Sequence, residues 1–120
     1  MKVYIYDKCS TCRDAVQFLE QRKIQFKTIP IRETPPSLAE LKQMLNLYQG
    51  NIRKLFNTSG LEYKALGLKD KLPAMDEPEA LKLLASNGKL VKRPFVLLDN
   101  KNGLVGFKRE EWGELFPAGG

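Results

Sequence analysis

The hydrophobic pattern at the start of the chain changes from strand-like to helix-like and back again. Residues 2–6 are a β-branched and aromatic run that is typical of a strand. From residue 12 to about residue 23, apolar side chains recur at helical spacing. Residues 25–29 then alternate polar and apolar positions, and the run stops at Pro30. This order predicts a βαβ unit with two parallel strands.

The middle of the chain has the pattern of helices that begin at polar residues. Ser37 and Glu40 have the spacing of a capping box. The helix that they begin should end near Gly50, in the left-handed conformation that glycine adopts most easily. A shorter helix is predicted over residues 51–56, and residues 58–73 are predicted as a turn-rich segment.

A further helix is predicted with Asp76 as its N-cap, because an acidic residue and a proline follow in the first turn. Asn87 and Gly88 are typical of a C-terminal stop and should end this helix. Residues 95–98 and 104–107 are two strand-like runs separated by a turn-rich stretch, which predicts a β-hairpin.

The end of the chain and the overall composition are those of a globular protein. A closing helix is predicted over residues 110–116, with Trp112 packed in the core. A chain of 120 residues with 42% hydrophobic and 28% charged residues can bury a core in one domain. We expect a single domain over residues 1–117 and a disordered tail over residues 118–120.

The formal charge of +6 raises the question of nucleic-acid partners. The lysines and arginines are scattered among acidic residues and form no basic run interleaved with aromatic residues, so we expect no direct nucleic-acid binding. No apolar stretch reaches membrane-spanning length, and because residues 1–2 lead directly into a strand-like run we expect no signal sequence. We therefore expect a cytoplasmic monomer without a membrane partner.

The two cysteines of the chain, Cys9 and Cys12, lie where the first strand is predicted to turn into a helix. Free amide groups and the helix dipole favour a thiolate there, and Lys8 and Arg13 add positive charge. We therefore expect a lowered cysteine pKa. A mixed disulfide on Cys9 would lie within reach of Cys12, so the pair is a candidate redox site with a Cys9 nucleophile and a Cys12 resolving thiol.

Two other interpretations of this pair stay open. In the first, both cysteines are ordinary buried residues that pack as small apolar groups. In the second, they are half of a zinc site, although the chain has no histidine and no further cysteine, so carboxylates would have to complete the site. The position of the pair at a β-to-α turn favours the redox interpretation, and we expect no metal site.

Four short motifs, taken in order, are similar to those of a known family. They are Cys9-Ser10-Thr11-Cys12-Arg13, Leu55-Phe56-Asn57-Thr58-Ser59-Gly60 with Tyr63, Leu66-Gly67-Leu68, and Lys92-Arg93-Pro94. By these motifs the chain resembles the arsenate reductase (ArsC)/Spx family, from Lys2 to about Phe116. The resemblance implies an α/β fold with a thioredoxin/glutaredoxin-like mixed sheet and an inserted helical segment over about residues 37–87. It also implies a cis peptide bond before Pro94, with Pro94 facing the reactive cysteine.

One branch of the family consists of arsenate reductases, which attack the oxyanion with one cysteine and surround it with three arginines. The resemblance gives Cys9 the role of that cysteine and Arg93 the role of one arginine. Ser10, Thr11 and Arg13 are the further substrate-binding candidates of the cysteine loop. The resemblance implies no bound cofactor, and it implies external thioredoxin or glutathione with glutaredoxin as the reductant.

The other two arginine positions of that branch are changed in this chain. Asn57 stands in one of them and Phe107 in the other. Arginine binds an oxyanion with two directional hydrogen bonds, so the loss of two arginines should weaken arsenate binding considerably. Lys108 or Arg53 would be a less directional replacement.

The Spx branch uses the cysteine pair as a redox switch and binds the C-terminal domain of the RNA polymerase α subunit. Gly50 resembles a glycine of that contact surface, whereas Ser59 stands where Spx proteins have an arginine. Three hypotheses follow: a thiol-disulfide reductase of arsenate-reductase type, a redox-sensing transcriptional regulator, and a scaffold with incidental cysteines.

Overall fold

A four-stranded mixed sheet lies at the centre of the computed structural model, which describes residues 1–99 and 101–117. Its strands, in the spatial order β2-β1-β3-β4, are β1 (Lys2–Ile5), β2 (Lys27–Pro30), β3 (Phe95–Leu97) and β4 (Gly103–Val105). β1 pairs in parallel with β2 and antiparallel with β3, and β3 pairs antiparallel with β4. The predicted βαβ unit and hairpin are confirmed. Asn100 of the predicted turn and the predicted tail 118–120 lie outside the described residues.

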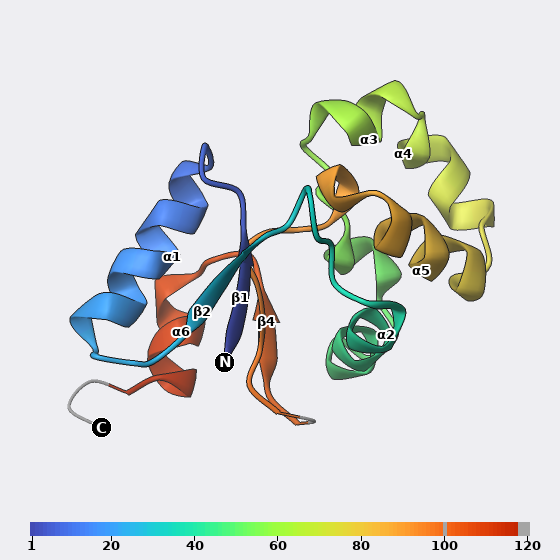
Figure 1. Ribbon diagram of the computed structural model, residues 1–120. Coiled ribbons are helices and arrows are strands. Elements are labelled where there is room, and N and C mark those ends of the chain that lie inside the picture. The colour runs from blue at the N-terminus through green and yellow to red at the C-terminus, as the bar shows by residue number, and fades with distance from the viewer. Residues whose placement is uncertain (100, 118–120) are drawn as a thin grey trace.

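Helices cover both faces of this sheet, and the alternation of side chains along the strands decides what each face contacts. α1 (Ser10–Gln21) and α6 (Arg109–Leu115) lie on one side, and the helices between β2 and β3 lie on the other (Figure 1). Val3 and Val96 pack with the fully buried Trp112 on the first side, which confirms its predicted place in the core. Tyr4 and Phe95 point to the other side, with their rings edge to face at 5.7 Å.

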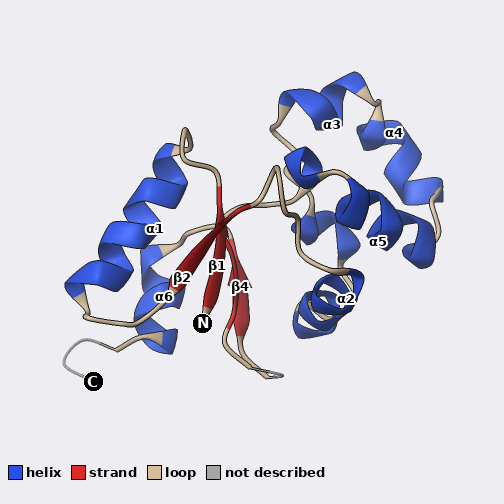
Figure 2. Ribbon diagram, viewed as in Figure 1, coloured by secondary structure: helices blue, strands red, loops and turns tan. Residues whose placement is uncertain are grey.

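The segment between β2 and β3 is a series of short helices, drawn in blue in Figure 2. Its elements are α2 (Leu38–Leu47), η1 (Ile52–Leu55), α3 (Leu61–Ala65), α4 (Leu68–Lys71), η2 (Leu72–Ala74), α5 (Glu77–Ser86) and η3 (Gly88–Leu90), where η marks a 3-10 turn. The turn-rich prediction for residues 58–73 was therefore wrong, because two α-helices lie there. Each is only about one turn long, too short for a helical period to show in the sequence. They are held by burying Tyr63 and Leu68.

The predicted helix caps are confirmed where they depend on neighbouring residues alone. The Ser37 side chain accepts a hydrogen bond from the backbone N–H of Glu40, and the Glu40 side chain accepts one from the N–H of Ser37. The Asp76 side chain accepts a bond from the N–H of Glu79 at 3.1 Å. Gly50 has a φ of +82°, the left-handed conformation that was expected at the end of α2.

α5 ends at Ser86 with Asn87 as its C-cap, so the stop predicted at Asn87 and Gly88 is confirmed, although it is not made by a left-handed glycine. Asn87 is extended, with a φ of −144°, and Gly88 begins η3, so neither residue forms a left-handed helix stop. Gly88 is required for a different reason: a Cβ there would collide with the backbone of Ile31 and Arg32, in the segment after β2. A side chain at position 88 would therefore displace that segment. This contact joins residues far apart in the sequence, so helix-end patterns could not predict it.

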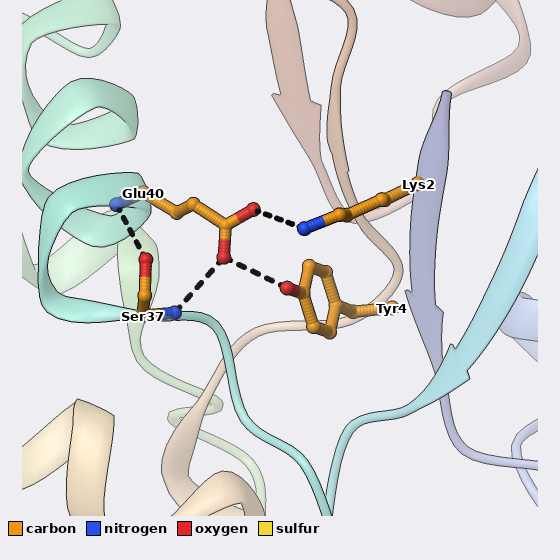
Figure 3. A network of polar contacts seen from close by, with 4 residues as sticks. All are labelled: Lys2, Tyr4, Ser37 and Glu40. Carbon is orange, nitrogen blue, oxygen red and sulfur yellow. Dashed lines mark hydrogen bonds and ion pairs between the residues drawn. The ribbon is translucent and has the colours of Figure 1, made fainter.

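One polar network ties the sheet to the helical segment (Figure 3). The Tyr4 hydroxyl of β1 donates a hydrogen bond of 2.7 Å to Oε1 of Glu40 in α2. The same oxygen accepts the bond of 3.0 Å from the N–H of Ser37, and Nζ of Lys2 lies 3.6 Å from Oε2. Burial alone would raise the pKa of Glu40, but these partners together lower it below its usual range.

No helix in the part of the chain described here is long and apolar enough to cross a membrane.

We expect Glu40→Gln to lower the free energy of unfolding by about 1 kcal/mol at pH 7, because the charged acceptor is lost while the shape is kept. The lowered pKa of Glu40 favours its charged form in the folded state. Its contribution is thus present above the unfolded pKa of about 4.3 and is lost as the pH falls through the folded pKa. Urea unfolding of both proteins from pH 7 to pH 3 measures this.

The matched control is Glu20→Gln, since Glu20 is exposed on α1. It should shift stability by less than about 0.5 kcal/mol at every pH. A stability difference between Glu40→Gln and the wild type that did not shrink at low pH would show that the charge of Glu40 contributes nothing to the network.

Candidate redox site

The two cysteines lie at the start of α1, immediately after a tight turn that leaves β1. The N–H of Cys9 donates a hydrogen bond of 3.1 Å to the carbonyl of Tyr6, and the carbonyl of Cys9 accepts one of 3.1 Å from the N–H of Arg13. Cys9 is the N-cap residue of α1, and Cys12 lies in its first turn, as predicted. Both thiols are free. They differ in accessibility, because Cys9 is half-buried and only 1% of Cys12 is exposed.

Burial decides the acidity of Cys12. It raises the pKa of the Cys12 thiol to about 12, although the Tyr6 N–H, which donates to Sγ at 3.5 Å, and the charge of Arg93 act in the opposite direction. The interaction with the neighbouring Cys9 thiol raises the pKa further. The expected lowering of a cysteine pKa by the helix N-terminus is therefore wrong for Cys12, since a sequence does not show how deeply a thiol is buried. Cys12 is a thiol at neutral pH.

Arg93 lies beside the cysteines because of the pairing between β1 and β3. The paired residues end with Tyr4 opposite Phe95, and two residues further along each chain Tyr6 and Arg93 lie close together. The Arg93 guanidinium carbon lies 5.3 Å from the centre of the Tyr6 ring. The peptide bond between Arg93 and the buried Pro94 is cis, the geometry implied by the resemblance.

The guanidinium of Arg93 is only partly accessible. Its Nη1 atom is buried and has no hydrogen-bond partner in residues 1–99 and 101–117. A buried donor without a partner is costly, and it marks a place where an acceptor from a ligand would be stabilised.

A pocket of about 360 Å³ extends from Arg93 toward the helical segment. Its walls are formed by Tyr6, Arg32, Asn57, Gly60, Leu61, Glu62, Lys89 and Arg93. The Arg32 guanidinium carbon lies 4.7 Å from the centre of the Tyr6 ring, so two guanidinium groups contact one aromatic side chain. The pocket therefore offers more than one cation to an anionic group.

Arg32 is a functional candidate that the sequence did not indicate. It follows β2, with no motif around it, and reaches the pocket only because β2 pairs with β1. The anticipated replacements for the missing arginines lie elsewhere: Arg53 and Lys108 line a different cavity. Phe107 packs against Phe18, with ring centres 5.6 Å apart, and contributes to the core.

The side chains of the other loop candidates form no hydrogen bond with the cysteines within the described residues. Ser10, Thr11 and Arg13 are exposed, and within the described residues their side chains make no hydrogen bond, ion pair or ring contact. Asn57, which by the resemblance stands in one of the two changed arginine positions, lines the pocket. The same part of the chain holds no group of three potential metal ligands.

Comparison with known proteins identifies the family of this chain. The sequence model of the ArsC family matches residues 4–115. This chain belongs to the ArsC family. A solved structure of an ArsC family related protein from Bacteroides fragilis has 45% sequence identity and a TM-score of 0.88, over 95% of each chain. The fold of this ArsC-family chain is thioredoxin-like, with a mixed sheet and helices on both faces.

Its relatives in the family have different roles. The chain is 45% identical over 111 residues to the uncharacterized protein YusI of Bacillus subtilis (strain 168), covering 92% of this chain and 93% of YusI. It is 33% identical over 102 residues to an arsenate reductase of Neisseria meningitidis serogroup A (strain Z2491), covering 84% and 86%. It is 29% identical over 118 residues to the global transcriptional regulator Spx of Enterococcus faecalis (strain V583), covering 98% and 86%.

We expect iodoacetamide to alkylate Cys9 much faster than Cys12 in the folded ArsC-family chain at pH 7. A thiol with a pKa of about 12 is ionised to only about one part in 10⁵ at that pH, and Cys12 is also shielded from the reagent. The single-cysteine variants Cys12→Ser and Cys9→Ser isolate the two rates, which mass spectrometry measures.

In Cys9→Ser the rate at Cys12 should rise about tenfold per pH unit up to roughly pH 10, because burial remains the main cause of the raised pKa. In guanidinium chloride the two variants should react alike. Equal rates in the folded state would contradict the assignment of Cys9 as the accessible thiol.

Proposed function

We propose that this protein is a thiol-disulfide oxidoreductase of the arsenate-reductase type, with Cys9 as nucleophile and Cys12 as resolving thiol. One observation carries the proposal: an accessible and a buried thiol are neighbours at the start of α1, beside a partly unsatisfied arginine. A zinc site at the two cysteines would need further ligands. If the cysteines were inert core residues, or the protein only a scaffold, the guanidinium groups that face the pocket would have no role.

In the first step the Cys9 thiolate attacks one sulfur of a substrate disulfide. A Cys9–substrate disulfide forms, and the other substrate sulfur leaves as a thiolate that takes up a proton. Cys12 then loses its proton and attacks the Cys9 sulfur, which releases the second substrate thiol. The products are two substrate thiols and a Cys9–Cys12 disulfide.

The buried state of Cys12 suits this second role. A thiol with a raised pKa is unreactive in the resting protein, and it can act on a neighbouring mixed disulfide once it is deprotonated. External thioredoxin, or glutathione with glutaredoxin, would supply the two electrons that restore both thiols. The protein itself would bind no cofactor and would act as a cytoplasmic monomer.

Arg93 and Arg32 would hold the anionic part of the substrate in the pocket. With arsenate, the Cys9 thiolate would form a bond to arsenic as one oxygen leaves as water. Attack of Cys12 on the Cys9 sulfur would then break the sulfur–arsenic bond, form the Cys9–Cys12 disulfide and release arsenite, with the two electrons supplied by the two thiols. Asn57 and Phe107 replace two arginines of that reaction, so we propose that disulfides carrying a carboxylate are better substrates than arsenate.

We expect Cys9→Ser to reduce turnover to background, and Cys12→Ser to accumulate a mixed disulfide on Cys9, because the resolving step is blocked. The assay couples NADPH oxidation to the reduction of arsenate and of glutathione-capped peptides, with thioredoxin and with glutathione–glutaredoxin in parallel. Intact mass spectrometry detects the trapped species. Full activity in Cys9→Ser would exclude Cys9 as the nucleophile.

We expect Arg93→Ala to raise KM for an anionic disulfide about tenfold with a smaller change in kcat, since a charge-assisted hydrogen bond is lost. The matched control is Lys82→Ala, which removes a charge from the exposed side of α5. Equal KM values in Arg93→Ala and the control would remove Arg93 from the binding site, whatever the outcome for the cysteines.

A second candidate function is supported by the Spx relative, which aligns with 98% of this chain. In this hypothesis the Cys9–Cys12 disulfide changes a contact with the C-terminal domain of the RNA polymerase α subunit. Gly50 is exposed, and a Cβ there would meet nothing within 4 Å, so the surrounding surface is open to a partner. Redox-dependent binding of that domain, together with no turnover in the coupled assay, would favour the regulator over the enzyme.

A further inference from the structure

A second cavity, of about 450 Å³, shares no lining residue with the pocket that contains Arg32 and Arg93, which we call the redox pocket because Arg93 lies beside Cys12. Its walls are formed by Tyr48, Asn51, Arg53, Lys54, Phe56, Thr58, Lys92, Val105, Lys108 and Glu111. An isolated β-bridge between Phe56 and Val91 holds two of these wall segments together. After this bridge the chain passes between the two pockets. Lys92 lines this cavity, and the next residue, Arg93, lines the redox pocket.

Four cations line the cavity. They are Arg53 and Lys54 of η1, Lys92 before β3, and Lys108 before α6. Over residues 1–99 and 101–117 the ion pair found is Lys2–Glu40, and none of the four cations makes a hydrogen bond through its side chain. One carboxylate, Glu111, shares the cavity, which leaves an excess of three positive charges. Like charges gathered around one space repel, and a bound anion would relieve the repulsion.

Neutral donors complete the lining. Asn51 is the N-cap residue of η1, yet its side chain makes no capping hydrogen bond and is free to contact a ligand. Thr58 is half-buried at the opposite wall. The Tyr48 hydroxyl accepts a hydrogen bond of 3.1 Å from the N–H of Val105 and keeps its own proton to donate, because burial raises the pKa of Tyr48. Buried Phe56 supplies an apolar wall.

We propose that this cavity is a binding site for a small phosphorylated compound with a diphosphate or triphosphate group. Lysine binds phosphate oxygens as a point charge, and the arginine adds directional donors. An excess of three positive charges matches the charge of such a group better than that of a single carboxylate. The site is separate from the cysteines, so the proposal does not depend on the reductase function.

The test is isothermal titration with inorganic pyrophosphate and with tripolyphosphate at pH 7.5 and low salt. We expect one site per chain, and a loss of affinity of about tenfold or more in the double variant Lys54→Gln/Lys92→Gln. The matched control, Lys69→Gln/Lys82→Gln, removes the same charge from exposed positions of α4 and α5 and should change affinity less than about twofold. Circular dichroism checks that all variants are folded.

Arg93→Ala separates this cavity from the redox pocket and should leave pyrophosphate affinity unchanged. A loss of affinity in Arg93→Ala but not in Lys54→Gln/Lys92→Gln would place the anion in the redox pocket and overturn the proposal. Equal losses in the two lysine double variants would show diffuse attraction to the surface charge. No binding of either phosphate, or binding of a single-stranded RNA oligonucleotide alone, would also overturn it.

Discussion

The register between β1 and β3 is the constraint on which the site depends. Tyr4 pairs with Phe95 at the end of β1 and the start of β3. The residues just beyond this pair, Tyr6 and Arg93, therefore lie close enough for the guanidinium group to contact the ring. The N–H of Tyr6 is then available to the sulfur of Cys12, while its ring contacts a guanidinium group. A slip by one residue in this pairing would turn one strand over relative to the other, so that the Val3 side of β1 would face the helical segment. The cores on both sides of the sheet therefore hold the chemistry in place.

Features set by neighbouring residues could be predicted from the sequence. The capping box of Ser37 and Glu40, the hairpin, and the position of the cysteines at the start of a helix all depend on spacings of a few residues. Features that depend on packing could not. The burial that keeps Cys12 protonated comes from surrounding elements, and Arg32 reaches the pocket through strand pairing. The short helices α3 and α4 are stabilised by burying Tyr63 and Leu68 in the core, which depends on the rest of the fold.

The positive charges of the chain are distributed differently in the folded structure than along the sequence. Along the sequence the cations are scattered, which is typical of a solvated surface. Folding gathers some of them into two groups on either side of one short segment, because Lys92 and Arg93 line different cavities. The group around Arg93 lies beside the cysteines, and the group around Lys92 does not. One stretch of backbone before β3 therefore positions both.

The absence of a side chain at Gly88 also bears on how this site can evolve. The backbone of Gly88 lies against that of Ile31 and Arg32, so the segment carrying the second guanidinium of the pocket is seated on a glycine. A substitution at position 88 would move Arg32 without touching any substrate. Mutations at the two positions should therefore be epistatic, and the charge at position 32 can be understood only together with the residue at position 88.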